Sequence, residues 1–127
     1  MSRDYEIPFN MFIEEILLTI DEYTSIKIKD GFEFEGYTFS MSEFAQLNWN
    51  SIKNAPRDLF PLSIGCKDIG SYMLELDKLD AWYNTMFSYK QVILNKCSDT
   101  KLAISKCTSV DDALVIFDSY IRYINLL

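Results

Sequence analysis

The longest regular pattern of hydrophobic and polar positions runs from Asp77 to Cys107. This stretch contains no Gly or Pro. Much of its apolar spacing is three, four or seven positions, which is typical of one buried helical stripe. The apolar residues are Leu79, Trp82, Tyr83, Met86, Val92, Ile93, Cys97, Ile104 and Cys107. The pattern predicts one long helix over residues 77–107, roughly 45 Å long if unbroken, against which the other elements pack.

A second amphipathic helix is predicted over residues 9–23. Its acidic side chains lie away from an apolar face formed by Phe9, Phe12, Ile13, Ile16, Leu17, Ile20 and Tyr23. Residues 1–8 are predicted to be a polar lead-in that ends at Pro8, because proline is tolerated in a first helical turn. Two interpretations stay open: the helix packs on its own domain, or it is an arm that docks on a neighbouring subunit. The acidic outer face argues against a membrane-surface helix.

Short strands are predicted within residues 26–39. Polar residues there alternate with Ile26, Ile28, Phe32, Phe34, Tyr37 and Phe39. An alternation with period two is typical of strands with one buried face. Asp30-Gly31 is a strong tight-turn signal and Glu35-Gly36 a weaker one. We therefore expect an antiparallel hairpin or a three-stranded meander.

A third helix is predicted from Ser40 to about Asn54. Ser40 and Glu43 have the Ser-x-x-Glu spacing of a capping box, and Pro56 ends the helix. This helix should bury Phe44, Ala45, Leu47 or Asn48, and Ile52.

The remaining elements are a second hairpin and a last helix. Residues 62–67 and 72–76 are two short extended runs around the turn 68–71, and Asp77 should cap the long helix that follows. Thr108-Ser109 precedes Asp111 and Asp112 as a helix start with acids in its first turn. The last helix has an apolar stripe of Val110, Ala113, Leu114, Phe117, Tyr120, Ile121 and Ile124.

The predicted fold is α+β, with two antiparallel hairpins and four helices. Residues 1–127 are expected to form a single domain, made of the N-terminal helix (1–25) and an α+β core (26–127).

Composition changes this picture in two ways. The net charge of −7 argues against nucleic-acid binding, because an acidic surface repels phosphates. The chain also holds nine Phe, eight Tyr and two Trp. These rings either fill the core or leave some aromatic surface for a protein interface. The residues predicted to bind a partner are Phe12, Ile16, Trp49, Trp82 and Tyr123.

Catalytic and metal-binding patterns are missing from the sequence. It has no histidine and no phosphate-binding Gly-rich motif. The three cysteines (Cys66, Cys97 and Cys107) have no metal-site spacing, so we expect reduced thiols and a cytoplasmic folding environment. The carboxylate pairs Glu14/Glu15, Glu33/Glu35 and Asp111/Asp112 each fit a solvated or helix-start position. We therefore predict no enzyme activity, no cofactor and no metal. Neither a signal peptide nor a membrane span is predicted.

Part of the chain resembles a family of small domains from tailed bacteriophages. The first stretch is GFEFEGYTFSMSEFAQLNWNSIKNA, in which Gly36, Phe39 and Gln46-Leu47-Asn48 stand at the family's positions. The second is Leu102 to Cys107, followed by Thr108 to Leu114. The resemblance covers about residues 32–117 and leaves out residues 1–25.

This resemblance implies a function, because such domains occur alone or at the C-terminus of tail-associated and tail-fibre-assembly-type proteins. It implies a structural or accessory protein of the virion, assembled in the host cytoplasm. Such a protein would be an adaptor that binds other tail or tail-fibre proteins, in several copies set by the particle's symmetry. The alternative is a tail-fibre assembly chaperone that is absent from the mature virion. The family carries no established catalytic residues.

Overall fold

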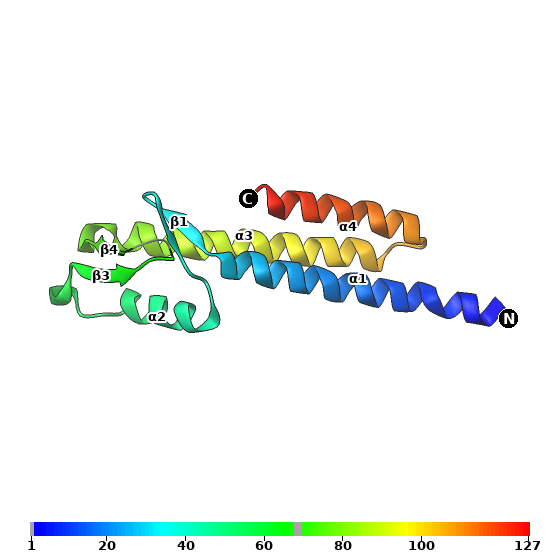
Figure 1. Cartoon of the computed structure of the whole chain (residues 1–127), viewed down its shortest axis with the longest axis horizontal. Coiled ribbons are helices and arrows are strands. Elements are labelled where there is room, and N and C mark those ends of the chain that lie inside the picture. The colour runs from blue at the N-terminus through cyan, green and yellow to red at the C-terminus, as the bar shows by residue number, and fades with distance from the viewer. Residues whose placement is uncertain (1, 68–69) are drawn as a thin grey trace. The chain divides into compact units, whose positions relative to one another are not determined.

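The computed structural model describes residues 2–67 and 70–127, which form an α+β fold as predicted (Figure 1). Within the described residues, four helices and two β-hairpins follow one another along the chain. The elements are α1 (Ser2–Asp30), β1 (Phe32–Phe34), β2 (Tyr37–Phe39), α2 (Glu43–Lys53), β3 (Leu62–Gly65), β4 (Ser71–Leu74), α3 (Leu79–Ser105) and α4 (Val110–Asn125). Short 3-10 turns occupy Arg57–Leu59 and Leu76–Lys78.

The chain divides into two compact units. The helical unit consists of residues 1–26 and 92–127, and the mixed unit consists of residues 27–91. Both units contain parts of α1 and α3, since the divisions fall within these helices. The prediction that residues 1–127 form one domain stays a prediction.

The core of the helical unit lies between α1, α3 and α4. Its buried residues are Ile16, Ile20, Cys97, Ile104, Ala113, Tyr120 and Ile124. The hydroxyls of Thr24 and Tyr120 hydrogen-bond to each other within this core. In Figure 1, α4 turns back along the C-terminal half of α3. The apolar face of α1 therefore packs on helices of its own chain.

Rings pack together in the core of the mixed unit. Phe39 lies at the centre of these contacts, with its ring against those of Phe32, Trp49, Tyr72 and Trp82. The cluster joins both hairpins to α2 and α3. Because aromatic side chains bury large areas, it supplies much of the apolar burial in this unit.

Both hairpins are antiparallel. β1 pairs with β2 so that Phe32 faces Phe39, and the turn at Glu35-Gly36 has positive φ at both residues, as a type I′ turn requires. β3 pairs with β4 from Leu62 opposite Leu74 to Gly65 opposite Ser71, which confirms the second hairpin with shorter strands. The predicted turn of that hairpin includes residues 68–69, which lie outside the described residues.

The expected strand at residues 26–29 is wrong, because α1 continues to Asp30. Ile26 is 59% exposed and Ile28 only 7% exposed. Ile28 extends a series of buried positions four residues apart, formed by Ile16, Ile20, Thr24 and Ile28. This buried helical stripe spans 13 residues, from Ile16 to Ile28, whereas the strand-like alternation spans only residues 26–29. The first sheet therefore has two strands, and Asp30-Gly31 ends the helix.

Three helix starts also differ from the prediction. α1 begins at Ser2, so Pro8 lies in its second turn and residues 2–8 are helical. α3 begins at Leu79 after a 3-10 turn that contains the expected cap, Asp77, and it ends at Ser105. α2 is capped by Ser42, two residues after the expected Ser40. The start of α4 is confirmed, since Ser109 Oγ accepts a hydrogen bond from Asp112 N.

Gly31 is a position where a methyl group should be costly. Its φ is +104°, and a Cβ atom added there would lie 2.2 Å from the carbonyl oxygen of Phe39. Gly36 is the matched control, because its φ is +83° and nothing lies within 4 Å of an added Cβ. We expect G36A to lower the free energy of unfolding by about 1 kcal/mol and G31A by about 3 kcal/mol or more. Urea unfolding followed by tryptophan fluorescence measures both, and equal losses would contradict the close contact.

The two buried tryptophans should respond differently to loss of the indole N–H. Trp49 Nε1 donates to the carbonyl of Ser40 at 2.7 Å, whereas buried Trp82 Nε1 has no hydrogen-bond partner among the described residues. W49F and W82F remove similar ring surface, but only W49F leaves a carbonyl without its donor. We expect W49F to cost about 1 kcal/mol more in unfolding free energy than W82F. A larger loss for W82F in the same urea assay would refute this assignment.

Candidate protein-binding surface

The inner face of α2 is fixed in the mixed unit by its first turn and by Trp49. Ser42 Oγ accepts a hydrogen bond from Ala45 N at 3.1 Å, which satisfies one free donor at the start of the helix. Trp49 is 4% exposed and lies edge-to-face with Trp82, at 5.4 Å between ring centroids. Since Ala45 and Trp49 point inward, side chains on the opposite side of α2 must point into solvent.

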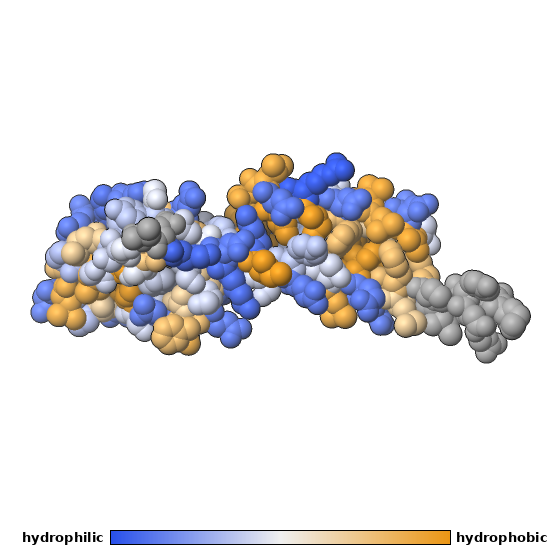
Figure 2. Space-filling model, in the orientation of Figure 1, coloured by the Kyte–Doolittle hydropathy of each residue, from blue (hydrophilic) through white to orange (hydrophobic). Residues whose placement is uncertain are grey.

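That outer side exposes two large hydrophobic residues. Phe44 is 81% exposed and Leu47 is 68% exposed. Asn48 and Ser51 are also exposed and lie on the same side of the helix. We call these four residues the α2 patch. Figure 2 shows hydrophobic atoms at the surface along the edge that α2 forms. Exposed hydrophobic residues on a rigid helix, without a charge among them, are typical of a protein contact.

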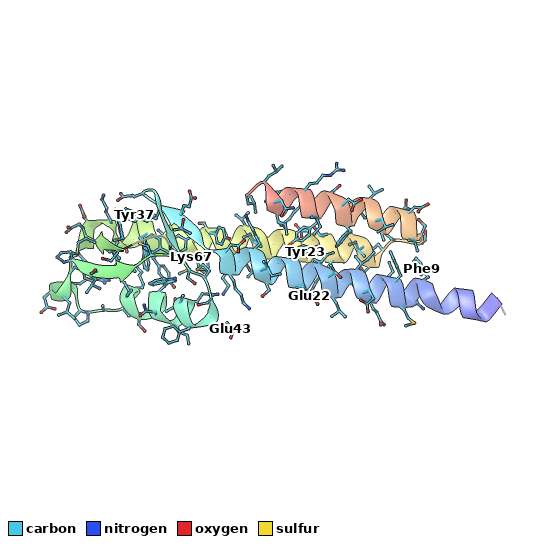
Figure 3. All side chains as sticks on the ribbon, viewed as in Figure 1. Phe9, Glu22, Tyr23, Tyr37, Glu43 and Lys67 are labelled. Carbon is cyan, nitrogen blue, oxygen red and sulfur yellow. The ribbon has the colours of Figure 1, made fainter. Side chains whose placement is uncertain are left out.

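An open hollow of about 320 Å³ adjoins the α2 patch. Phe44 and Asn48 line it together with Ser40, Ser42, Ala45, Trp49, Gly65, Cys66 and Lys67. Lys67 (Figure 3) fixes the far wall, because its backbone N donates to Thr38 O and its Nζ to Asp30 O, each at 2.8 Å. The patch therefore combines projecting apolar side chains with an adjacent depression.

A smaller hollow of about 180 Å³ lies between α2 and α3 within the mixed unit. Its polar groups bond to one another. Tyr83 OH donates to Asn50 Oδ1 at 2.8 Å, and Lys90 Nζ donates to Gln46 Oε1. These contacts hold α2 against α3, so we interpret this hollow as part of the scaffold.

A different kind of surface follows the outer side of α1. Met11 and Leu18 are exposed there, and they lie among the exposed Glu14, Glu15 and Glu22. We call these five residues the α1 ridge. Figure 3 labels Glu22 and its neighbour Tyr23, whose ring meets Phe117 of α4 at 6.5 Å. The α1 ridge is thus acidic, whereas the α2 patch is neutral.

The residues predicted to bind a partner occupy other places. Ile16, Trp49 and Trp82 are buried in cores of the chain itself. Phe12 and Tyr123 are half-buried against the core of the helical unit, and Lys96 Nζ lies 5.0 Å from the centre of the Tyr123 ring. The structure therefore moves the candidate surface to Phe44 and Leu47.

The expected burial of α2 is confirmed for Ala45 and wrong for Phe44 and Leu47, which are exposed. Successive helical residues are about 100° apart, so Phe44 and Leu47 lie on a different side of α2 from Ala45 and Trp49. Ala45 and Trp49, spaced four apart, mark the buried side of α2.

The carboxylate pairs lie in structural positions. Glu14 and Glu15 are exposed on α1, and Asp111 and Asp112 are exposed in the first turn of α4. Within residues 2–67 and 70–127, no group of three or more Cys, Asp or Glu side chains is arranged to hold a metal ion. No disulfide joins Cys66, Cys97 and Cys107, and Cys97 is buried.

Glu35, from the pair Glu33/Glu35, joins the two hairpins of the mixed unit. Its carboxylate accepts hydrogen bonds from Lys78 Nζ at 2.7 Å and from Tyr72 OH at 2.7 Å. The hydrogen bond from Lys78, and then the one from Tyr72, lowers the pKa of Glu35. Burial, followed by the hydrogen bond to Glu35, raises the pKa of Tyr72. Burial also raises the pKa values of Tyr89 and Tyr120 to about 12. Each of these shifts moves a group away from titration near neutral pH.

Comparison with known proteins adds no relative. No family model, curated protein or solved structure matches this chain. Among the described residues, no helix combines the length and the apolar character needed to cross a membrane.

The role of Glu35 predicts a pH dependence of stability. Because its folded-state pKa lies below the ordinary value of 4.5, Glu35 stabilises the fold above about pH 4.5, and this stabilisation is lost as pH falls through the folded-state pKa. We expect E35Q to be less stable than wild type at pH 7, with the difference shrinking at acidic pH. Thermal unfolding between neutral and acidic pH measures this.

E33Q is the matched control for this prediction. Glu33 is exposed on the same hairpin and forms no side-chain hydrogen bond or ion pair with the described residues. A difference between wild type and E35Q that stays constant with pH would argue against the ionic role of Glu35.

Proposed function

We propose that this protein is a non-enzymatic structural or accessory component of a tailed phage particle. Its role is that of a tail-associated adaptor that binds other virion proteins. The exposed α2 patch is the observation that supports a protein-binding role. The phage context is supported by the resemblance over residues 32–117, a range that includes the patch.

The way α2 is held favours binding over chemistry. The Ser42 cap and the buried Trp49 fix the helix before any partner arrives. Association through a preorganised surface loses less conformational entropy than association that orders a loop. Phe44 and Leu47 are thereby presented as fixed apolar anchors, the kind of residue on which protein interfaces depend.

An adaptor must contact more than one partner, and the chain offers two surfaces of different chemistry. The α1 ridge carries Glu14, Glu15 and Glu22 beside Met11 and Leu18. Such a surface favours a partner with basic residues around an apolar strip. The α2 patch favours a neutral partner. Two surfaces with different preferences allow the two contacts to be made independently.

The proposal predicts where the protein is found and what the α2 patch does there. Mass spectrometry of purified phage particles should detect the chain. In particles assembled with the double variant F44S/L47S, we expect about tenfold less of it, because two exposed anchors are lost. F87S is the control, since Phe87 is an exposed phenylalanine of α3 outside the patch.

The same experiment separates an adaptor from an assembly chaperone. A chaperone would be absent from wild-type particles, and tail-fibre yield would fall when the protein is omitted. Absence from particles combined with unchanged fibre yield would overturn both functions. Normal incorporation of F44S/L47S would show that the patch is not the contact.

A further inference from the structure

We propose that the partner of the α2 patch is a second copy of this chain, bound through an antiparallel pair of α2 helices. This inference rests on the proposed function, because it names the partner of the α2 patch, the surface to which that function assigns protein binding. It describes a two-fold symmetric contact, in which the same patch is used by both copies.

The first argument is electrostatic. In a two-fold contact, residues near the axis meet their own copies, so a charged face repels itself. The chain carries a net charge of −7, and the α1 ridge would place its glutamates against one another. The α2 patch has no charged member. Its apolar side chains can pack on their own copies, and the Asn48 amide can both donate to and accept from its own copy.

The second argument comes from the two ends of α2. Glu43 lies in the first turn (Figure 3), and Arg57 lies beside the last turn, where its Nη1 donates to Lys53 O at 3.2 Å. Both side chains are exposed. An antiparallel pair brings the start of each helix to the end of the other. Glu43 of one copy then approaches Arg57 of the second copy, and the helix dipoles also oppose each other favourably.

The other basic residue at this end is already engaged. Lys53 Nζ lies 2.6 Å from Asp80 Oδ1 and near the ring of Tyr83. Among the described residues, Arg57 forms no ion pair, so its charge remains the one available to a carboxylate from outside. Ser51, between the two ends, is small enough to let the helices approach closely.

The size of the patch sets the strength of the contact. A helix of 11 residues is about 16 Å long, and one face of it buries less than the roughly 800 Å² per partner of a standard stable interface. The isolated dimer should therefore be weak. In a particle with several copies held close together, a high effective concentration would favour the same contact.

Analytical ultracentrifugation of the full chain tests this inference. From about 10 µM to about 1 mM, the range for a weak dimer, the mass should rise from 14.8 kDa towards twice that value. F44S/L47S should remain monomeric, and F87S should behave like wild type. A wild-type chain that is monomeric at the highest concentration, or an F44S/L47S variant that still dimerises, overturns the proposal.

A charge exchange tests the antiparallel arrangement. E43R and R57E should each weaken dimerisation about fivefold, because like charges then meet across the contact. The double variant E43R/R57E should restore wild-type dimerisation, since each copy then carries both exchanges and opposite charges meet again across the contact. Failure of this rescue, with thermal unfolding showing all variants folded, overturns the arrangement.

These outcomes are distinct from those that test the adaptor function. A chain that stays monomeric in solution but is found in purified particles would overturn the second-copy contact and leave the adaptor function standing. A chain that dimerises in solution but is absent from particles and has no effect on fibre yield would overturn the adaptor function and leave the second-copy contact standing.

Discussion

The packing of Trp49 against Phe39 and Trp82 is the contact on which the candidate surface depends. The ring centroids of Trp49 lie 6.1 Å from Phe39 and 5.4 Å from Trp82. Successive helical residues are about 100° apart, so burying Trp49 decides which side of α2 faces solvent. Phe44 and Leu47 are exposed for this reason. The exposed patch is thus a consequence of the buried ring cluster.

Long periodic segments could be predicted from the sequence, because many residues agree on one period. α3 and α4 each repeat an apolar stripe over several turns, and Ser109 marks the start of α4. The end of α1 could not be predicted in this way. Ile26 to Lys29 alternate with period two, while Ile28 also continues the four-residue spacing from Ile16. Two periods overlap in those few residues, and only packing of the whole helix decides between them.

The candidate surface was harder to predict than the fold. Phe44, Ala45, Leu47 and Trp49 are all apolar residues of α2, so the local sequence leaves open which of them point inward. That choice depends on Phe39 and Trp82, one of which comes from an element about 30 residues away along the chain. The tryptophans were expected at an interface because interfaces are enriched in them. Their large rings instead gain more from the core, where each is almost completely removed from water.

Charge then determines what each exposed surface can contact. With a net charge of −7, two copies of the chain repel each other at a distance, which opposes contacts between randomly chosen faces. This repulsion does not distinguish among acidic surfaces, but it is least where the approaching faces carry no charge. On an acidic protein, two copies of a neutral face therefore repel each other less than two copies of an acidic face. The acidic α1 ridge has the opposite property, because like charges oppose its contact with its own copy and complementary charges would favour a basic surface. The two surfaces consequently favour ligands of different charge.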